Sequence, residues 1–205
     1  LESWVTDATE IAVLVARNPD GDVKSFPVVE LVFNPEANLV DYLVSPARIS
    51  VDLEAKAREI SENLVRKLDF VGLLAVEMFV TQSGEVLINE IAPRPHNSGH
   101  HTIEACFTSQ YDQHLRSILN WPLGSTVLRS AAAMINLLGE RGFEGPVIYE
   151  GLSDAISENG VYPHLYGKRI TKSFRKMGHV TVLDNTTTDA LAKAQRIKEA
   201  IRVIS

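Results

Sequence analysis

Cysteine is almost absent from this chain of 205 residues, since Cys106 is the only one. A single cysteine excludes an internal disulfide, suits a reducing compartment and favours a cytoplasmic location. The sequence also lacks an apolar run long enough to span a membrane and a signal-peptide pattern, so we expect no membrane partner. Aromatic residues make up only 7% of the chain and the formal net charge is −6. Nucleic acid is therefore not an expected partner either, because no aromatic platform or extended basic face is available to bind it.

Several catalytic signatures are missing as well. The sequence shows no Ser/His/Asp pattern, no zinc-ligand spacing and no Walker loop, and it has no glycine-rich loop that would cover the phosphates of a nucleotide. Cys106 is expected to be a small buried apolar residue rather than a nucleophile. His114 falls within an expected helix, where a packing or surface role is the simplest interpretation.

What remains is an ordinary globular composition, 45% hydrophobic and 22% charged. A chain of this size can bury one sizeable core or two small ones. We predict an α+β fold with mostly antiparallel strands in its first part and a subdomain boundary near 124–130. Because the chain starts at Leu1 rather than at Met and enters strand-like sequence at once, we expect it to be a fragment of a longer protein.

Hydrophobic periodicity and turn residues predict the main elements. The clearest helix covers 52–68, where Leu53, Ala57, Ile60, Leu64 and Leu68 share one face. The remaining expected elements are strands over 11–16, 23–33 and 39–44, a hairpin over 73–91, a helix over 109–119, strands over 131–138, 161–166 and 179–183, and a final amphipathic helix over 191–204.

The hairpin is the most informative stretch, because two apolar runs flank the turn at Ser83-Gly84. A two-residue loop would set Glu77 directly opposite Glu90. Cross-strand partners have Cβ atoms about 5 Å apart, and like charges placed there destabilise a sheet. A divalent cation would neutralise both carboxylates, and Mg²⁺ bridged to phosphates is the commonest case.

Three alternatives to a metal remain open at this point. One of the two glutamates could be protonated, or it could pair with Arg94 or with a segment outside the chain. A loop longer by one residue would remove the register that places the glutamates opposite each other.

The segment that follows the hairpin is rich in Pro, Arg, His, Asn and Gly. Asn89 and Glu90 deliver polar groups into this loop, which is a common way for a fold to build a site. Arg94 offers a planar set of donors that suits phosphate or carboxylate. His96 and Asn97 are compact polar groups, and the nearby Gly99 allows the backbone to approach a ligand. Each residue taken singly could be an ordinary loop residue, but their concentration beside Glu90 predicts a site.

A second cluster is basic. Five of the nine residues from 168 to 176 are Lys or Arg, in a chain that is acidic overall. Glycines flank this cluster, and the combination fits a phosphate monoester or another small anion. A solvated basic loop is the alternative.

The string from Ile88 to His100, with Thr102-Ile103 and 108–116 after it, resembles N5-carboxyaminoimidazole ribonucleotide synthetase. This is the ATP-grasp family of purine biosynthesis that is also called the ATPase subunit of phosphoribosylaminoimidazole carboxylase. The segments 166–168 and 175–179 are similar to the C-terminal signature of that family.

The resemblance covers essentially all 205 residues. It implies that 1–126 form the second half of an ATP-grasp domain and that 127–205 form a small β-rich C-terminal domain with a terminal helix. The N-terminal domain, the first ATP-grasp lobe and its nucleotide-binding lysines would then lie outside the chain.

The implied reaction converts ATP, bicarbonate and 5-aminoimidazole ribonucleotide into N5-carboxyaminoimidazole ribonucleotide, ADP and phosphate, through carboxyphosphate and with Mg²⁺. The fragment would be inactive alone, and a homodimer of the full-length protein is left open. Two alternatives stay open. One is another ATP-grasp carboxylate-amine ligase, such as the formate-dependent glycinamide ribonucleotide transformylase, and the other is a non-catalytic nucleotide-binding module.

The resemblance also implies residue roles. In these roles Glu77 and Glu90 hold Mg²⁺ with Asn89 beside them, Glu2 lies near adenine, Arg94, His96 and Asn97 steady carboxyphosphate, and Lys168, Arg175 and Lys176 hold the 5′-phosphate of the ribonucleotide. The chain departs from the family near Glu30, where Leu31 and Phe33 stand in place of the usual Asn and His, so a nucleotide contact there is in question.

Overall fold

The computed structural model describes residues 5–34 and 39–205. The chain divides into two compact units, Leu1–Leu31 with Ser45–Arg129 and Val32–Val44 with Ser130–Ser205. The division between 126 and 127 expected from the sequence stays a prediction, while the structure changes unit between 129 and 130. No sequence pattern indicated that 32–44 would join the second unit. Within the described ranges, no helix has the length and apolarity needed to cross a membrane.

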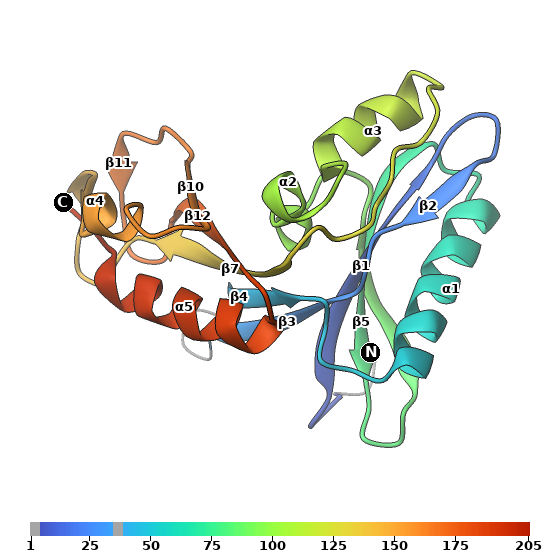
Figure 1. The fold of residues 1–205 in the computed structure, drawn as a ribbon, viewed down its shortest axis with the longest axis horizontal. Coiled ribbons are helices and arrows are strands. Elements are labelled where there is room, and N and C mark those ends of the chain that lie inside the picture. Colours follow the sequence, from blue (N-terminus) through green and yellow to red (C-terminus); the bar gives the residue numbers. More distant parts are fainter. Residues whose placement is uncertain (1–4, 35–38) are drawn as a thin grey trace. The chain divides into compact units, whose positions relative to one another are not determined.

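The first unit is built on an antiparallel sheet whose strands lie in the order β3-β1-β5-β6, with β2 paired to β1 (Figure 1). These strands are β1 (Thr9–Arg17), β2 (Val23–Ser25), β3 (Val29–Asn34), β5 (Gly72–Val80) and β6 (Val86–Ala92). The longest ladder joins β1 to β5 without a break, from Thr9 opposite Val80 to Arg17 opposite Gly72. The central strands of the sheet are therefore a rigid platform for whatever β5 and β6 carry.

The strand predicted over 23–33 is wrong in its middle, because β2 and β3 are separate strands. Pro27 lies between them and has no N–H to donate to a sheet ladder. Phe26 instead donates its N–H to the carbonyl of Leu14 at 2.8 Å and buries its ring completely. The strands predicted over 11–16 and 39–44 are confirmed within β1 and β4 (Leu39–Ser45).

Helix α1 (Val51–Lys67) covers one face of this sheet. Its N-terminus is capped by the Ser50 hydroxyl, which accepts the N–H of Leu53 at 3.3 Å, and basic residues occupy its last turn. Ala57 and Val65 on the buried face of α1 pack in one core with the apolar side chains of β1 and β5 that face the helix. The predicted helix is confirmed, but Leu68 is its C-cap and 52% exposed rather than part of the buried face.

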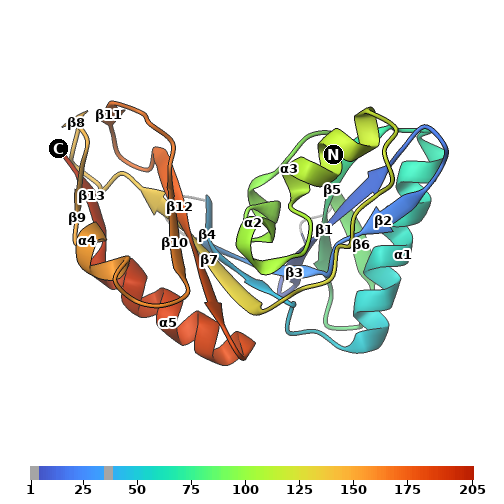
Figure 2. The ribbon, with the colours of Figure 1, turned by 45° about the horizontal axis from the view of Figure 1, so that its top comes forward.

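The opposite face of the sheet is covered by a short helical region, which Figure 2 shows separated from α1 by the strands. This region comprises the 3₁₀ turn η1 (Asn97–Gly99) and the helices α2 (Thr102–Ala105) and α3 (Gln110–Ile118). Helix α3 packs on β1 and β5, and its N-cap is Ser109, whose hydroxyl accepts the N–H of Asp112 at 3.1 Å. The helix predicted over 109–119 is confirmed. His114 of α3 accepts the backbone N–H of Leu73 at 3.3 Å, which gives it the expected packing role.

The second unit contains the strands β10-β12-β7-β4, in that order, and the same nine-stranded sheet continues from β4 to β3. Besides β4, these strands are β7 (Ala131–Leu138), β10 (Val161–Leu165) and β12 (Lys176–Asp184), and two small sheets pair β8 (Gly145–Pro146) with β11 (Ile170–Thr171) and β9 (Ile148–Glu150) with β13 (Arg202–Ile204). A single turn of helix, α4 (Leu152–Ala155), and the longer α5 (Thr187–Ala200) complete the unit. Helix α5 packs on β7 and β12, and the core between them consists of small and branched apolar side chains.

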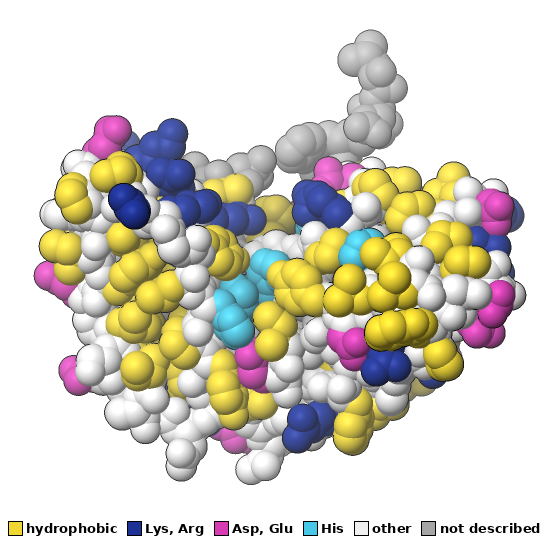
Figure 3. All heavy atoms as spheres, turned by 90° about the horizontal axis from the view of Figure 1, so that it is seen from above, with side chains coloured by type: hydrophobic (Ala, Val, Ile, Leu, Met, Phe, Trp, Pro, Cys, Tyr) yellow, Lys and Arg dark blue, Asp and Glu magenta, His cyan; other side chains and the backbone are white. Residues whose placement is uncertain are grey.

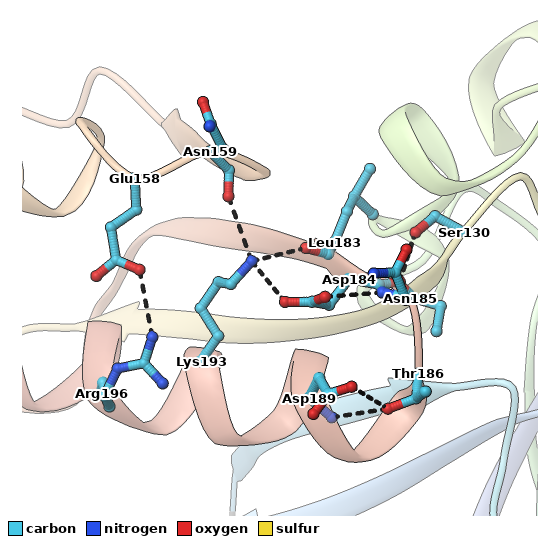
Figure 4. A network of polar contacts seen from close by, with 11 residues as sticks. Ser130, Glu158, Asn159, Leu183, Asp184, Asn185, Thr186, Asp189, Lys193 and Arg196 are labelled. Carbon is cyan, nitrogen blue, oxygen red and sulfur yellow. Dashed lines mark hydrogen bonds and ion pairs between the residues drawn. The ribbon is translucent and has the colours of Figure 1, made fainter.

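Polar contacts fasten α5 to the end of β12, as Figure 4 shows. The Lys193 ammonium lies 2.6 Å from the Asp184 carboxylate and donates to the carbonyls of Leu183 and Asn159. The Thr186 hydroxyl caps the helix by accepting the N–H of Asp189 at 3.1 Å. The final helix predicted over 191–204 is therefore wrong at both ends, since α5 begins at Thr187 and the chain from Arg202 to Ile204 is a strand.

Candidate active site

The turn between β5 and β6 is longer than predicted. Thr81 donates its N–H to the carbonyl of Glu85 at 2.9 Å, and Gly84 donates to the carbonyl of Thr81 at 3.0 Å. Three residues therefore form the loop, and Gly84 adopts a φ of +80°, which favours glycine. The two-residue loop expected from the sequence is wrong. Next to the turn, Val80 pairs with Val86 and Met78 pairs with Ile88.

A β-bulge restores the predicted pairing of the glutamates. The register of β5 and β6 shifts between Glu77 and Met78, so that Glu77 lies opposite Glu90 while Met78 lies opposite Ile88. Asn89 is the extra residue on β6. The predicted pairing of the two carboxylates is thus confirmed, but it results from a bulge that was not predicted from the sequence. A bulge bends its strand and re-aims side chains, and bulges are frequent beside active sites.

Glu77, Glu90 and His96 form a candidate cation site. Each can offer one donor atom, and these atoms all lie within 4.8 Å of one another. Glu77 is buried at 9% exposure, His96 is half-buried and Glu90 is exposed, so the group reaches solvent through Glu90. The Nδ1 atom of His96 lies 3.5 Å from Oε1 of Glu77. Two carboxylates of this kind fit Mg²⁺, which binds through one or two carboxylates and keeps its other positions for water and phosphate.

Arg94 does not neutralise the glutamates. Its guanidinium is exposed and donates to the carbonyl of Pro95 at 3.1 Å. Across residues 5–34 and 39–205, it makes no ion pair with Glu77 or Glu90. One of the alternatives to a metal is thereby removed, and Arg94 keeps its donors at the protein surface. Asn89 is likewise exposed, Asn97 is half-buried at the start of η1, and Glu2 lies outside the described residues.

The loop that carries His96 is held by residues of α2 and α3. His96 is the N-cap of η1, and its Nδ1 lies 2.9 Å from the Ser98 hydroxyl. Gln110 binds the backbone of His96 through both ends of its side-chain amide, at 2.8 and 2.9 Å. The sequence reasoning did not identify Gln110, because nothing in a lone glutamine near a helix start shows that its side chain turns inward. Its place inside the string that carries the family resemblance was the available signal.

The basic cluster lies in the second unit, on the loops beside β12. The Lys168 ammonium donates to the carbonyl of Lys176 at 2.6 Å and lies 5.6 Å from the centre of the Tyr166 ring. The Arg175 guanidinium donates to the carbonyl of Ile170 at 2.8 Å. The structure therefore brings Lys168 beside Lys176. The two contacts of Lys168 and Arg175 are to neutral carbonyls, which do not cancel the positive charges.

Two histidines lie beside this cluster. His179 ends the segment 175–179 that the sequence analysis singled out, whereas His164 was not identified from the sequence. His164 and His179 face each other across β10 and β12 with stacked rings 4.5 Å apart. The Tyr166 hydroxyl lies 3.0 Å from Nδ1 of His179. Gly178 permits this close packing, since a Cβ at its position would lie 2.5 Å from the carbonyl oxygen of His164. The cluster thus combines basic, aromatic and imidazole groups on one sheet.

Comparison with protein families defines the class of the chain. The ATP-grasp domain family matches residues 1–111, and the family described as the phosphoribosylaminoimidazole carboxylase C-terminal domain matches residues 132–193. The antiparallel sheet with its paired glutamates is therefore part of an ATP-grasp domain. The chain belongs to the N5-carboxyaminoimidazole ribonucleotide synthetase family of ATP-grasp proteins. The family and the fold class predicted from the sequence are confirmed.

Relatives with curated names support this membership. The chain is 42% identical over 183 residues to the N5-carboxyaminoimidazole ribonucleotide synthase of Bacillus subtilis, covering 89% of this chain and 46% of that protein. It is 40% identical over 190 residues to the chloroplastic phosphoribosylaminoimidazole carboxylase of Vigna aconitifolia, covering 90% of this chain and 33% of that protein. The chain therefore spans half or less of the length of these relatives.

Solved structures give the same picture. The synthetase of Thermotoga maritima matches with a TM-score of 0.92 and 48% identity, over 100% of this chain and 54% of that one. The synthase of Aspergillus clavatus in complex with ADP and 5-aminoimidazole ribonucleotide matches with a TM-score of 0.87 and 35% identity, over 96% of this chain and 52% of that one.

Proposed function

We propose that the protein containing this chain carboxylates 5-aminoimidazole ribonucleotide with ATP and bicarbonate, and that the 205 residues alone are inactive. In this reaction a bicarbonate oxygen attacks the γ-phosphorus of ATP and ADP leaves. The amine of the ribonucleotide then attacks the carbon of carboxyphosphate, loses a proton and expels phosphate. The observation that carries the proposal is the meeting of Glu77, Glu90 and His96 within 4.8 Å at the β5–β6 bulge.

The carboxylate pair is the part of the site suited to a cation. Glu77 and Glu90 would hold Mg²⁺, with Asn89 beside them at the bulge. Mg²⁺ bound in this way supplies charge neutralisation at the phosphates of ATP. Phosphoryl transfer requires positioning and electrostatic stabilisation more than covalent chemistry from the protein, so a rigid pair of carboxylates is an adequate contribution.

The polar loop after β6 would hold the reactive carboxyl group. Arg94 presents exposed donors that match the oxygens of carboxyphosphate, and His96 and Asn97 lie next along the loop. Glu2 would contact the nucleotide base. Each of these roles is a proposal that follows from family membership, and for Arg94 also from the exposure of its guanidinium.

Lys168, Arg175 and Lys176 would hold the 5′-phosphate of the ribonucleotide. Support comes from the Lys168 ammonium, which donates to the backbone carbonyl of Lys176 at 2.6 Å and so lies at the start of β12. The Aspergillus clavatus relative is described in complex with ADP and 5-aminoimidazole ribonucleotide, which supports small-molecule substrates of this class. A cytoplasmic location and a homodimer are also proposed for the full-length protein.

The decisive experiment follows ADP release by the protein expressed from its complete gene. Mg-ATP and bicarbonate are supplied with and without 5-aminoimidazole ribonucleotide. We expect release that depends on the ribonucleotide, and we expect Glu90→Gln to reduce it at least 100-fold, as loss of a positioned charge at a phosphoryl site does. Glu85→Gln is the matched control, because Glu85 is an exposed glutamate of the same hairpin, next to its turn. Release that ignores the ribonucleotide would indicate a different ATP-grasp ligase, and binding of ATP without any release would indicate a non-catalytic module.

A further inference from the structure

Gln110 is a completely buried polar residue at the first position of α3. Its side chain points from the helix toward the loop that follows β6. The amide oxygen accepts the N–H of His96 at 2.8 Å, and the amide nitrogen donates to the carbonyl of His96 at 2.9 Å. The same nitrogen lies 2.9 Å from Nδ1 of His100. One side chain thus satisfies both backbone groups of His96, as a neighbouring β-strand would.

These bonds connect His96 to the strand that carries Glu77. Helix α3 packs on β1 and β5, and β5 contains Glu77. Gln110 therefore links the backbone of His96 to the same rigid layer, and the imidazole reaches to within 3.5 Å of the Glu77 carboxylate. A loop residue without such a link would lose this position through backbone motion, because a short loop has few buried contacts of its own.

The loop that contains His96 and Gly99 packs tightly against Gln110. A Cβ placed on Gly99 would lie 2.4 Å from the amide oxygen of Gln110, so the loop lies directly against the amide. The backbone N–H of Gln110 donates to the Thr102 hydroxyl at 2.8 Å, and that hydroxyl donates to the carbonyl of Gly99 at 2.6 Å. Backbone and side chain of Gln110 thus hold the two ends of the same loop.

We propose that Gln110 is a positioning residue that holds His96 as the third donor, beside Glu77 and Glu90, for a divalent cation. The inference rests on the proposed function, since it names a residue that shapes the same cation site. A buried partner that fixes a donor group typically changes metal affinity by 10- to 100-fold when it is removed.

The same helix provides a matched control. Gln113 is also completely buried, and it too binds a backbone segment through both ends of its amide. Its nitrogen donates to the carbonyl of Gly124 at 3.2 Å, and its oxygen accepts the N–H of Gly124 at 2.9 Å. Gln113 therefore matches Gln110 in residue type, burial and bonding, but the segment that it holds is not the loop of His96.

The test measures Mn²⁺ binding, by the loss of the free-ion electron paramagnetic resonance signal, in protein expressed from the complete gene. We expect Gln110→Met to weaken Mn²⁺ binding at least 10-fold and Gln113→Met to change it less than twofold, while both variants lower Tm. Unchanged Mn²⁺ binding in Gln110→Met, or an equal loss in Gln113→Met, would overturn the proposal. If Gln110→Met does not fold, Gln110→Asn takes its place, because a side chain shorter by one methylene does not reach the backbone of His96.

A double variant separates positioning from general loosening. If Gln110 acts through His96, then Gln110→Met adds no further loss of Mn²⁺ affinity to a His96→Ala protein. Additive losses would show that Gln110 acts by another route and would contradict the inference. Glu90→Gln tests the site itself. If it leaves Mn²⁺ binding intact, the proposed cation site fails. If it abolishes binding while Gln110→Met does not, only the role of Gln110 fails.

Discussion

Replacing Glu90 by Gln should have opposite effects on stability and on cation binding. In the protein without a cation, Glu77 and Glu90 are like charges with oxygens within 4.8 Å. Coulomb's law gives a repulsion of about 3.5 kcal/mol at an effective dielectric constant of about 20 and about 0.9 kcal/mol in water. Because Glu90 is exposed, the value should lie toward the lower end. We therefore expect Glu90→Gln to raise the free energy of unfolding by about 1–2 kcal/mol in the presence of EDTA.

The assay is urea unfolding of the full-length wild type and of Glu90→Gln, with EDTA and with Mg²⁺ or Mn²⁺. In the wild type the cation should raise the unfolding midpoint, because a ligand that binds the native state stabilises it. In the variant this increase should disappear. The control Glu85→Gln removes a charge next to the turn of the same hairpin and should show the wild-type response to the cation. A Glu90→Gln protein that is less stable than the wild type in EDTA would refute the reasoning, since the carboxylates would then not repel each other in the native state.

Three further predictions concern single features of the fold. Hydrogen bonds from Arg48 lower the pKa of Glu30 below its usual 4.5, so this pair stabilises the protein above that pH and the contribution is lost as pH falls through the folded-state pKa. Arg48→Met should cost about 1–2 kcal/mol at pH 7 and flatten the stability profile at acid pH, measured by urea unfolding at several pH values. Burial raises the pKa of Cys106 to about 12, so iodoacetamide at pH 8 should leave it unmodified until denaturant exposes the thiol, as mass spectrometry would detect. Thr186→Ala removes the N-cap of α5 and should cost about 1 kcal/mol, whereas Thr188→Ala in the exposed first turn should cost less, and equal thermal unfolding of the two would contradict the capping role.

Exposed apolar side chains remain on the surface of α3 and the segment after it. Figure 3 shows hydrophobic side chains spread over one face of the molecule among basic and histidine side chains. On α3 itself, Tyr111, Leu115 and Ile118 are 41%, 52% and 48% exposed. The inward face of the same helix is polar and carries both buried glutamines. Amphipathic pattern therefore did not predict which side of α3 faces the sheet, because the buried polar groups here satisfy backbone of the neighbouring loops.

Local pattern was sufficient for the hairpin and for the long helix. Two apolar runs around a Ser-Gly turn predicted the pairing of β5 with β6, and one apolar face predicted α1. The sequence predicted both glutamates of the hairpin and their pairing, but the pairing depends on the bulge and not on the two-residue turn from which it was predicted. The cluster of Arg94, His96 and Asn97 could be read because polar groups gather immediately after Glu90.

Long-range packing decided what these patterns left open. The chain from Arg202 to Ile204 continues an apolar periodicity, but it pairs with β9, which is about fifty residues away, and becomes a strand. Long-range packing also decided that 32–44 belongs to the second unit.

The sequence by itself thus determined the family, the hairpin and the residue types of the site, since each depends on short stretches of neighbouring residues. Only the tertiary structure decided that a bulge at Asn89 corrects the register, and that Gln110 reaches back to His96. The bulge is a local irregularity of one residue, and the contact of Gln110 with His96 joins residues that are distant in the sequence. No periodic pattern predicts either of them. The physical reason is that a bulge and a buried amide are selected by the three-dimensional contacts that they satisfy, and not by the propensities of the residues that form them.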